Sequence, residues 1–333
     1  MERKNDLAIR VKEANELLFK LFERLPDMLT EHDEADRSFR DRCYERWENG
    51  LDLLKMFIVM SEEFGSAIND RERIIAVAKQ DYKFEATIAL HARGVRVANE
   101  ILTLLREGFP DGALSRWRTL HEVGVVSTFL STNEREASLR FLAHRGVVSA
   151  KALAQYQEYL PRSNMKPLRV GDLELAQGHR DQLIEKFGPE FKEEMGWAFP
   201  IIPKKKGINL FDLEKATGLD HWRPRFKWAS DDIHVGAKPH FASLGMAETA
   251  LDKPALLTGR SDSAFADPAH MCVISLNLAN HSIPTDYRNK DDEIILVALR
   301  TLSDLLGETF LEIDRATRKK SPRAMQGENE QEN

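Results

Sequence analysis

The sequence predicts an all-α protein, a multi-helix bundle with long antiparallel helices. Apolar residues recur every three or four positions along nearly the whole chain, and no convincing alternation of apolar and polar residues predicts a strand. Charged residues make up 31% of the chain, which suits long solvated helices, and hydrophobic residues make up 42%, enough for a sizeable core. We expect one large helical domain over residues 1–318 and a disordered polar tail over residues 319–333.

Five helices are expected in the first half of the chain. They are Asn5–Leu29, ending near Pro26, then Ser38–Phe64, Arg71–Glu107, Pro110–Leu130 and Asn133–Tyr159. Gly108 and Pro110 end the third helix, and the short turn there folds the fourth helix back antiparallel to it. The third helix carries a heptad-like seam in steps of three and four. Its members are Phe84, Ile88, His91, Val95, Ala98, Leu102 and Leu105.

The second half of the chain has a looser pattern up to about residue 220. Pro200, Pro203 and the run 204–206 of three lysines predict a loop there. Five further helices are expected in this half. They are Asp172–Phe187, Asn209–Thr217, about Trp222–Val235, Phe265–His281 and Asp291–Arg318.

Composition excludes several classes of protein. The net charge of −6 gives no global basic field, so an RNA contact would need a local patch. Cys43 and Cys272 form no CxxC motif, and residues 1–6 do not resemble a signal peptide, so we expect a reduced, cytoplasmic setting. No apolar run approaches the ~20 residues that span a bilayer, and we expect no membrane partner. Because phosphate-binding glycine loops and HExxH motifs are absent from the sequence, we expect no cofactor and no metal ion.

A polar trio begins an otherwise apolar stretch of the fourth helix. Arg118, His121 and Glu122 precede the apolar run that starts at Val123. Arg118 and Glu122 are four residues apart, so their side chains are neighbours on a helix. One interpretation is functional: Arg118 grips a phosphate or carboxylate, and Glu122 orients the guanidinium. The other is a buried structural salt bridge, in which removing one partner costs about 3–5 kcal/mol.

Two histidines are candidates for acid–base chemistry. Arg116 and His121 have the Arg-x4-His spacing of HEPN-type ribonucleases, but at ~100° per residue they lie roughly 140° apart around a helix. Arg118 shares the face of His121 better. His234 follows Asp231 and Asp232, which fits a general base or a metal ligand. It also fits a histidine that ends a helix before Gly236. We further expect His234 and Arg118 to converge on one cavity.

Two patches of the chain carry a resemblance to a known family. They run from Ala86, Leu90 and Arg93 to Gly108, Ala113, Trp117, Arg118, His121 and Glu122, and then over Trp228, Ser230 and His234. Roughly from Phe84 to Gly245, the chain resembles a bacterial helical family catalogued as domain of unknown function 5677. The resemblance implies an all-α fold in which Arg118, Glu122 and His234 correspond to recurring polar positions. It implies no established activity. This family is in turn similar to HEPN-like proteins of toxin and phage-defence systems.

Two functional hypotheses follow. The first is a bacterial intracellular defence or toxin-type protein that acts on RNA as a metal-independent ribonuclease. In it, Arg118 would hold the phosphate, Glu122 would orient Arg118, and His121 or His234 would be the general acid and base. The second is a non-enzymatic helical interaction or regulatory module, in which the Arg118–Glu122 pair is structural. Its partner would be another protein or a second copy in a homodimer.

Overall fold

All regular elements are helices in the part of the chain that the computed structural model describes, which confirms the expected all-α class. The described residues are 2–202, 204, 207–231, 233, 243–246 and 257–318. The predicted tail, residues 319–333, and His234 lie outside them. No helix within the described ranges is long and apolar enough to cross a membrane.

The first helix is much longer than the sequence predicted. Helix α1 runs without interruption over Glu2–Ala78, so the expected ends near Pro26 and Phe64 were wrong. Pro26 removes one backbone donor, but residues 27–49 contain no glycine and no second proline to stop the helix. The Thr30 hydroxyl donates to the carbonyl of Pro26 at 2.9 Å within the continuing helix.

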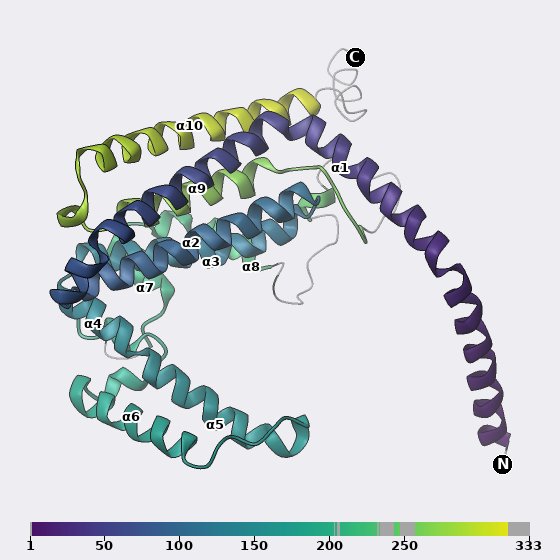
Figure 1. The fold of residues 1–333 in the computed structure, drawn as a ribbon, viewed down its shortest axis with the longest axis horizontal. Coiled ribbons are helices and arrows are strands. Elements are labelled where there is room, and N and C mark those ends of the chain that lie inside the picture. Colours follow the sequence, from purple (N-terminus) through teal and green to yellow (C-terminus); the bar gives the residue numbers. More distant parts are fainter. Residues whose placement is uncertain are drawn as a thin grey trace, which may run out of the picture.

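The helix ends instead where the backbone turns left-handed. Gln80 has a φ of 51°, and the Asp81 carboxylate accepts hydrogen bonds from the backbone N–H groups of Lys83 and Phe84. This N-cap starts α2, Tyr82–Arg106, so the expected helix start at Arg71 was wrong: residues 71–78 belong to α1. The later half of α1 lies along the body of the protein, whereas its first half projects away from it (Figure 1). We call residues 7–35 of α1 the arm, because every described side chain between these positions is exposed.

Four helices, α2, α3 (Pro110–Thr132), α9 (Ala266–His281) and α10 (Lys290–Arg318), pack together with the later half of α1 at the centre of the fold. Helix α3 packs on α2, α9 packs on both, and α10 packs on α1 and α9 (Figure 1). The predicted seam of α2 faces this core, since all seven of its side chains are buried. The Trp47 ring of α1 stacks on Phe265 and Phe310, with ring centroids 5.0 and 5.6 Å away. These contacts tie the later half of α1 to the C-terminal helices.

The shorter helices extend the bundle. They are α4, Arg135–Ala143, α5, Arg145–Ser163, α6, Asp172–Phe187, α7, Leu210–Thr217, and α8, Arg223–Ser230. Helix α4 packs on α2, α5 on α6, and α7 and α8 on α3. The predicted helix over 133–159 was wrong in extent, because the chain bends at His144, whose buried ring hydrogen-bonds to the carbonyl of Glu193 at 2.9 Å. Helix α8 is also shorter than expected. The predictions for α3, α6, α7, α9 and α10 agree with the structure to within two residues at each end.

The beginning of α3 holds a distant turn of the chain. The Asp111 carboxylate accepts hydrogen bonds from the backbone N–H groups of Leu244 and Gly245, at 2.7 and 2.9 Å, and from the hydroxyl of Ser243. These residues form a short 3-10 turn, Leu244–Met246. A carboxylate that receives several donors fixes their position strongly. The N-terminal end of α3 therefore anchors the chain 133 positions further along.

Candidate functional site

His121 of α3 belongs to a closed polar cluster that reaches two other helices. Its Nε2 atom lies 3.0 Å from Oε1 of Glu214 on α7, and the two side chains are 1% and 0% exposed. The Nη1 atom of Arg223, at the start of α8, donates to both carboxylate oxygens of Glu214 at 3.2 Å. Each oxygen of the buried carboxylate thus has a partner, as a buried charge requires.

The sequence around Glu214 explains how α7 places this carboxylate. Asn209 and Asp212 form a reciprocal capping box that starts the helix. From there, Leu210, Leu213 and Glu214 have the spacing of one helix face, and all three are buried. Sequence reasoning missed Glu214 and Arg223. The sequence did contain a signal for Glu214: it is an acidic residue on the apolar face of a short capped helix, and a buried acid needs a partner.

Aromatic rings pack on the His121 side of the cluster, whereas the Arg223 side chain is 27% exposed. The ring centroids of Trp117 and Phe226 lie 5.2 and 5.6 Å from that of His121. Trp117 donates its indole N–H to the hydroxyl of Ser275 at 2.9 Å. The guanidinium carbon of Arg223 lies 4.9 Å from the centroid of the Phe226 ring. The His121 imidazole is consequently buried between two aromatic rings, and its Nε2 atom is occupied by Glu214.

Arg118 and Glu122 lie beside this cluster but are not joined to each other by an ion pair within the described part of the chain. The Arg118 guanidinium lies 4.5 Å over the Phe226 ring, and its buried Nε atom has no hydrogen-bond partner among the described residues. Burial raises the pKa of the Glu122 carboxyl above its ordinary value, while the positive charges of Arg118 and Arg93 act in the opposite direction. The two predicted partners therefore interact through their fields and not through a direct contact.

Arg116 points to a different neighbour from His121. Its guanidinium pairs with Glu100 of α2, and its Nη1 atom donates to the hydroxyl of Thr119 at 3.1 Å. His121 instead faces α7. The Arg-x4-His spacing therefore does not bring these two side chains together, as the 140° separation around the helix had predicted.

The other histidines considered from the sequence divide into two groups. His91 and His144 are buried and hydrogen-bonded, to Asn280 and to the Glu193 carbonyl, so both are satisfied core histidines. His234 lies outside the described residues, and its convergence with Arg118 stays a prediction. Helix α8, which leads toward it, does pack on α3. The helices that carry the two patches of the family resemblance are therefore in contact, up to Ser230 at the end of α8.

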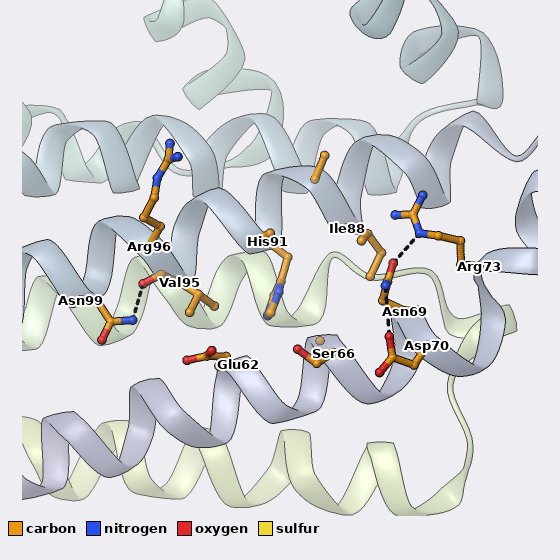
Figure 2. Close-up of a pocket in the computed structure, with 13 residues that line it drawn as sticks. Glu62, Ser66, Asn69, Asp70, Arg73, Ile88, His91, Val95, Arg96 and Asn99 are labelled. Atoms are coloured by element: carbon orange, nitrogen blue, oxygen red, sulfur yellow. Dashed lines mark hydrogen bonds between the residues drawn. The ribbon is translucent and has the colours of Figure 1, made fainter.

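An open groove of about 620 Å³ lies between α1 and α2 (Figure 2). Glu62, Ser66 and Asn69 line it from α1, and His91, Arg96 and Asn99 line it from α2. Of these, the sequence had singled out His91 alone. Its ring forms part of the inner wall, and its Nε2 atom is turned away to Asn280 at 2.9 Å.

The charges of this groove are mixed and partly paired with one another. Arg73 donates to Glu85 at 2.9 Å and to the side-chain oxygen of Asn69 at 2.7 Å. The side-chain nitrogen of Asn99 donates to the carbonyl of Val95 at 3.2 Å (Figure 2). Across the described residues, no group of three His, Cys, Asp or Glu side chains is arranged to hold a metal ion. The groove offers polar contacts from both helices.

Comparison with known proteins places the polar cluster within a family segment. No curated protein and no solved structure matches the chain significantly. A family model does match it, over residues 84–246, a segment that contains α2, α3, Glu214 and Arg223. The resemblance noted in the sequence is thereby confirmed: residues 84–246 of this chain match the model of the family of unknown function DUF5677.

Proposed function

We propose that this protein is a non-enzymatic helical interaction module of the cytoplasm, in which the polar cluster of the family segment is structural. The observation that carries the proposal is the burial of His121 and Glu214 against each other, at 1% and 0% exposure. A general acid or base must come within about 3 Å of a substrate atom, directly or through one water. The His121 ring has no surface left for such an approach.

Further contacts support a structural role for the cluster. Glu214 is bound from two directions by groups of α3 and α8, and the rings of Trp117 and Phe226 pack beside His121. A fully paired buried polar network fixes the relative position of the elements that it joins. Buried, unpaired thiols at Cys43 and Cys272 support a reducing cytoplasmic setting.

The ribonuclease hypothesis makes the opposite prediction and gives the test. The full-length chain is produced from an inducible promoter, purified, and incubated with labelled single-stranded RNA of mixed sequence. We expect growth equal to that of an empty vector and no RNA cleavage above the buffer control. Arg118→Ala is compared with Arg169→Ala, a matched removal of an exposed arginine outside the cluster.

Two results would overturn the proposal. One is RNA cleavage by the parent chain that Arg118→Ala abolishes and Arg169→Ala preserves, at equal melting temperatures. The other is growth arrest on expression with the same dependence on Arg118. Either would make the defence or toxin-type ribonuclease the better hypothesis. RNA would then have to reach His121 in a different conformation of the chain.

A further inference from the structure

The arm is a long helix with an apolar face that no described residue covers. Eleven large apolar side chains of the arm are exposed, from 36% for Leu25 to 71% for Phe19. The arm begins where α1 leaves the body, and it extends away from the other helices (Figure 1). An exposed apolar surface of this extent marks an interaction site.

The arm has the sequence pattern of a coiled coil. One seam follows strict steps of four and three residues. Its members are Leu7, Val11, Ala14, Leu18, Leu21, Leu25, Met28, His32 and Ala35. Leu17, Phe22 and Leu29 flank this seam and widen the apolar face. Pro26 falls on the opposite side of the helix, where its ring does not enter the seam.

The base of the arm is fixed to the body. Two nitrogens of Arg260 donate to the two carboxylate oxygens of Asp36, at 2.8 and 3.0 Å. Another nitrogen of Arg260 donates to the carbonyl of Glu107 at the end of α2, at 2.9 Å. A bidentate pair of this kind sets direction as well as distance. The arm therefore leaves the body in a defined direction, which lowers the entropic cost of binding a partner.

We propose that the arm pairs with the arm of a second copy of this chain in an antiparallel coiled coil. This inference deepens the proposed interaction function by naming its partner. Charge along the arm supports it. Residues 7–20 contain three basic and two acidic residues, whereas residues 21–35 contain one basic and five acidic residues. Antiparallel pairing brings the basic half of each arm onto the acidic half of the other, and parallel pairing brings the two acidic halves together.

One antiparallel register also pairs the apolar seam residues of the two arms with one another. It places Val11 opposite Met28, Ala14 opposite Leu25, and Leu18 opposite Leu21, each twice by symmetry. Leu7 then lies opposite His32. The paired stretch therefore covers nearly the whole exposed arm and ends close to Asp36, which is bound to the body. Parallel pairing would instead place His32 against its own copy in the seam.

The apolar area is sufficient for a stable dimer. Covering the nine of these side chains that lie in or beside the seam would remove on the order of 800 Å² from each arm, which is the area per partner of a specific interface. A lipid surface is the other class of occupant for an amphipathic helix. The arm carries seven acidic and four basic residues, and this excess of negative charge opposes binding to anionic lipid.

Sedimentation of the full-length chain tests the pairing. We expect a mass twice the 38.1 kDa of one chain at micromolar concentration. The double variant Leu18→Asp/Leu21→Asp should weaken self-association by more than about 100-fold, because its carboxylates would be buried without partners. Phe19→Asp, on the outward side of the arm, is the matched control and should leave the dimer intact. Both variants should keep the parent melting temperature, since every described side chain of the arm is exposed.

Disulfide trapping tests the orientation. Val11→Cys and Met28→Cys chains should cross-link only when mixed, because two copies of residue 11 lie about 25 Å apart in the antiparallel register. The native thiols of Cys43 and Cys272 are buried and do not compete. Cross-linking of Val11→Cys with itself would overturn the antiparallel arrangement.

Three other results would overturn the pairing itself. They are a one-chain mass at 100 µM, a dimer that survives the Leu18→Asp/Leu21→Asp change, and a monomer that binds vesicles of phosphatidylcholine and phosphatidylglycerol through the arm. None of them concerns RNA, so failure of this inference is distinguishable from failure of the proposed function. That function would fail on RNA cleavage, whatever the oligomeric state.

Discussion

His121 and Glu214 lie 93 positions apart in the sequence, yet their side chains form a 3.0 Å hydrogen bond in the interior of the protein. The bond joins α3, the central helix of the family segment, to the short helix α7. Arg223 then joins the same carboxylate to α8. Three elements of different length and position thus share one buried acid, and the relative placement of these helices depends on it.

The first prediction concerns the coupling of these two residues. His121→Ala and Glu214→Ala should each destabilise the fold by about 3 kcal/mol, because each change leaves a buried polar group without its partner. The double variant should lose less than the sum of the two single losses, by about 1–2 kcal/mol. Chemical denaturation of the four proteins in one cycle measures this difference. Strictly additive losses would mean that the hydrogen bond contributes no coupling energy.

The second prediction separates Arg118 from that network. Its guanidinium stacks on Phe226, and among the described residues its Nε atom has no hydrogen-bond partner. Arg118→Ala should therefore cost only about 1 kcal/mol, the size of a partly exposed cation–π contact. Arg118→Met, which keeps the length and the apolar contact, serves as the control and should cost less. A loss of 3 kcal/mol or more in denaturation would show that Arg118 has a buried anionic partner.

Long, strongly periodic helices could be predicted from the sequence, because burial of one face fixes their existence and type. The seam of α2 and the helices α3, α9 and α10 are of this kind. The sequence did not predict that α1 continues through Pro26. A proline on the exposed side of a helix removes one hydrogen bond, but the helix can continue past it. The exposure of the arm could not be predicted from the sequence either, because an amphipathic pattern does not show whether another part of the protein covers the apolar face.

The candidate site shows the same division. The polar trio of α3 was visible in the sequence, because charges beside an apolar run need partners. The identity of the partners was not visible, because Glu214 and Arg223 reach His121 only through the packing of α7 and α8 on α3. Local spacing favoured Arg118 with Glu122 as neighbours. In the folded protein, the Arg118 guanidinium instead lies over the Phe226 ring. Glu122 is half-buried, and the positive charges of Arg118 and Arg93 act on its carboxyl.

The third prediction concerns the close approach of α1 and α2 beside the groove. A Cβ atom added at Gly65 would lie 2.2 Å from Cε1 of His91, a ring that is itself buried and hydrogen-bonded. Gly65→Ala should destabilise the protein by about 1–3 kcal/mol, although alanine favours a helix. Gly178→Ala in α6 is the matched control, since nothing lies within 4 Å of its added Cβ. That control should be stabilising by about 0.5–1 kcal/mol. Equal melting shifts would contradict the contact.

The fourth prediction is a pH dependence that comes from His91. Burial lowers the pKa of this imidazole from 6.5 to about 4, and the hydrogen bond to Asn280 offsets only part of that shift. Between these two values the unfolded chain binds a proton that the folded chain excludes. The contribution of His91 to stability is therefore fully present above pH 6.5 and is lost as the pH falls toward 4. The slope for one such group is about 1.4 kcal/mol per pH unit.

A His91→Gln variant isolates this effect from other groups that titrate in the same range, among them His144 and His270, whose pKa values burial also lowers. Glutamine keeps a donor for Asn280 and does not titrate. Its free energy of unfolding, compared with that of the parent at pH 7 and pH 5, should fall less steeply with acid. Parallel pH profiles for the two proteins would show that His91 is protonated in the folded state.

The fifth prediction concerns Glu122, where the sign is reversed. Burial raises the pKa of this carboxyl above its ordinary value of 4.5, so the folded chain holds its proton more tightly than the unfolded chain does. Stability from this group is present below the ordinary pKa and is lost as the pH rises through the folded pKa. Glu122→Gln should therefore raise the melting temperature at pH 7 and have little effect at pH 4. A melting difference that does not change with pH would contradict the raised pKa.

The same substitution measures how Arg118 acts on Glu122 without touching it. The positive charge of Arg118 lowers the pKa of Glu122 against the larger effect of burial, so it stabilises the ionised carboxylate at neutral pH. When Arg118 is already alanine, the ionised carboxylate is less stable, and the gain from Glu122→Gln at pH 7 should be larger than in the parent chain. Thermal melts of the four proteins at low ionic strength and at 1 M salt check this, because screening reduces a through-space interaction. An equal gain in both backgrounds would show that the two charges of the predicted pair are independent.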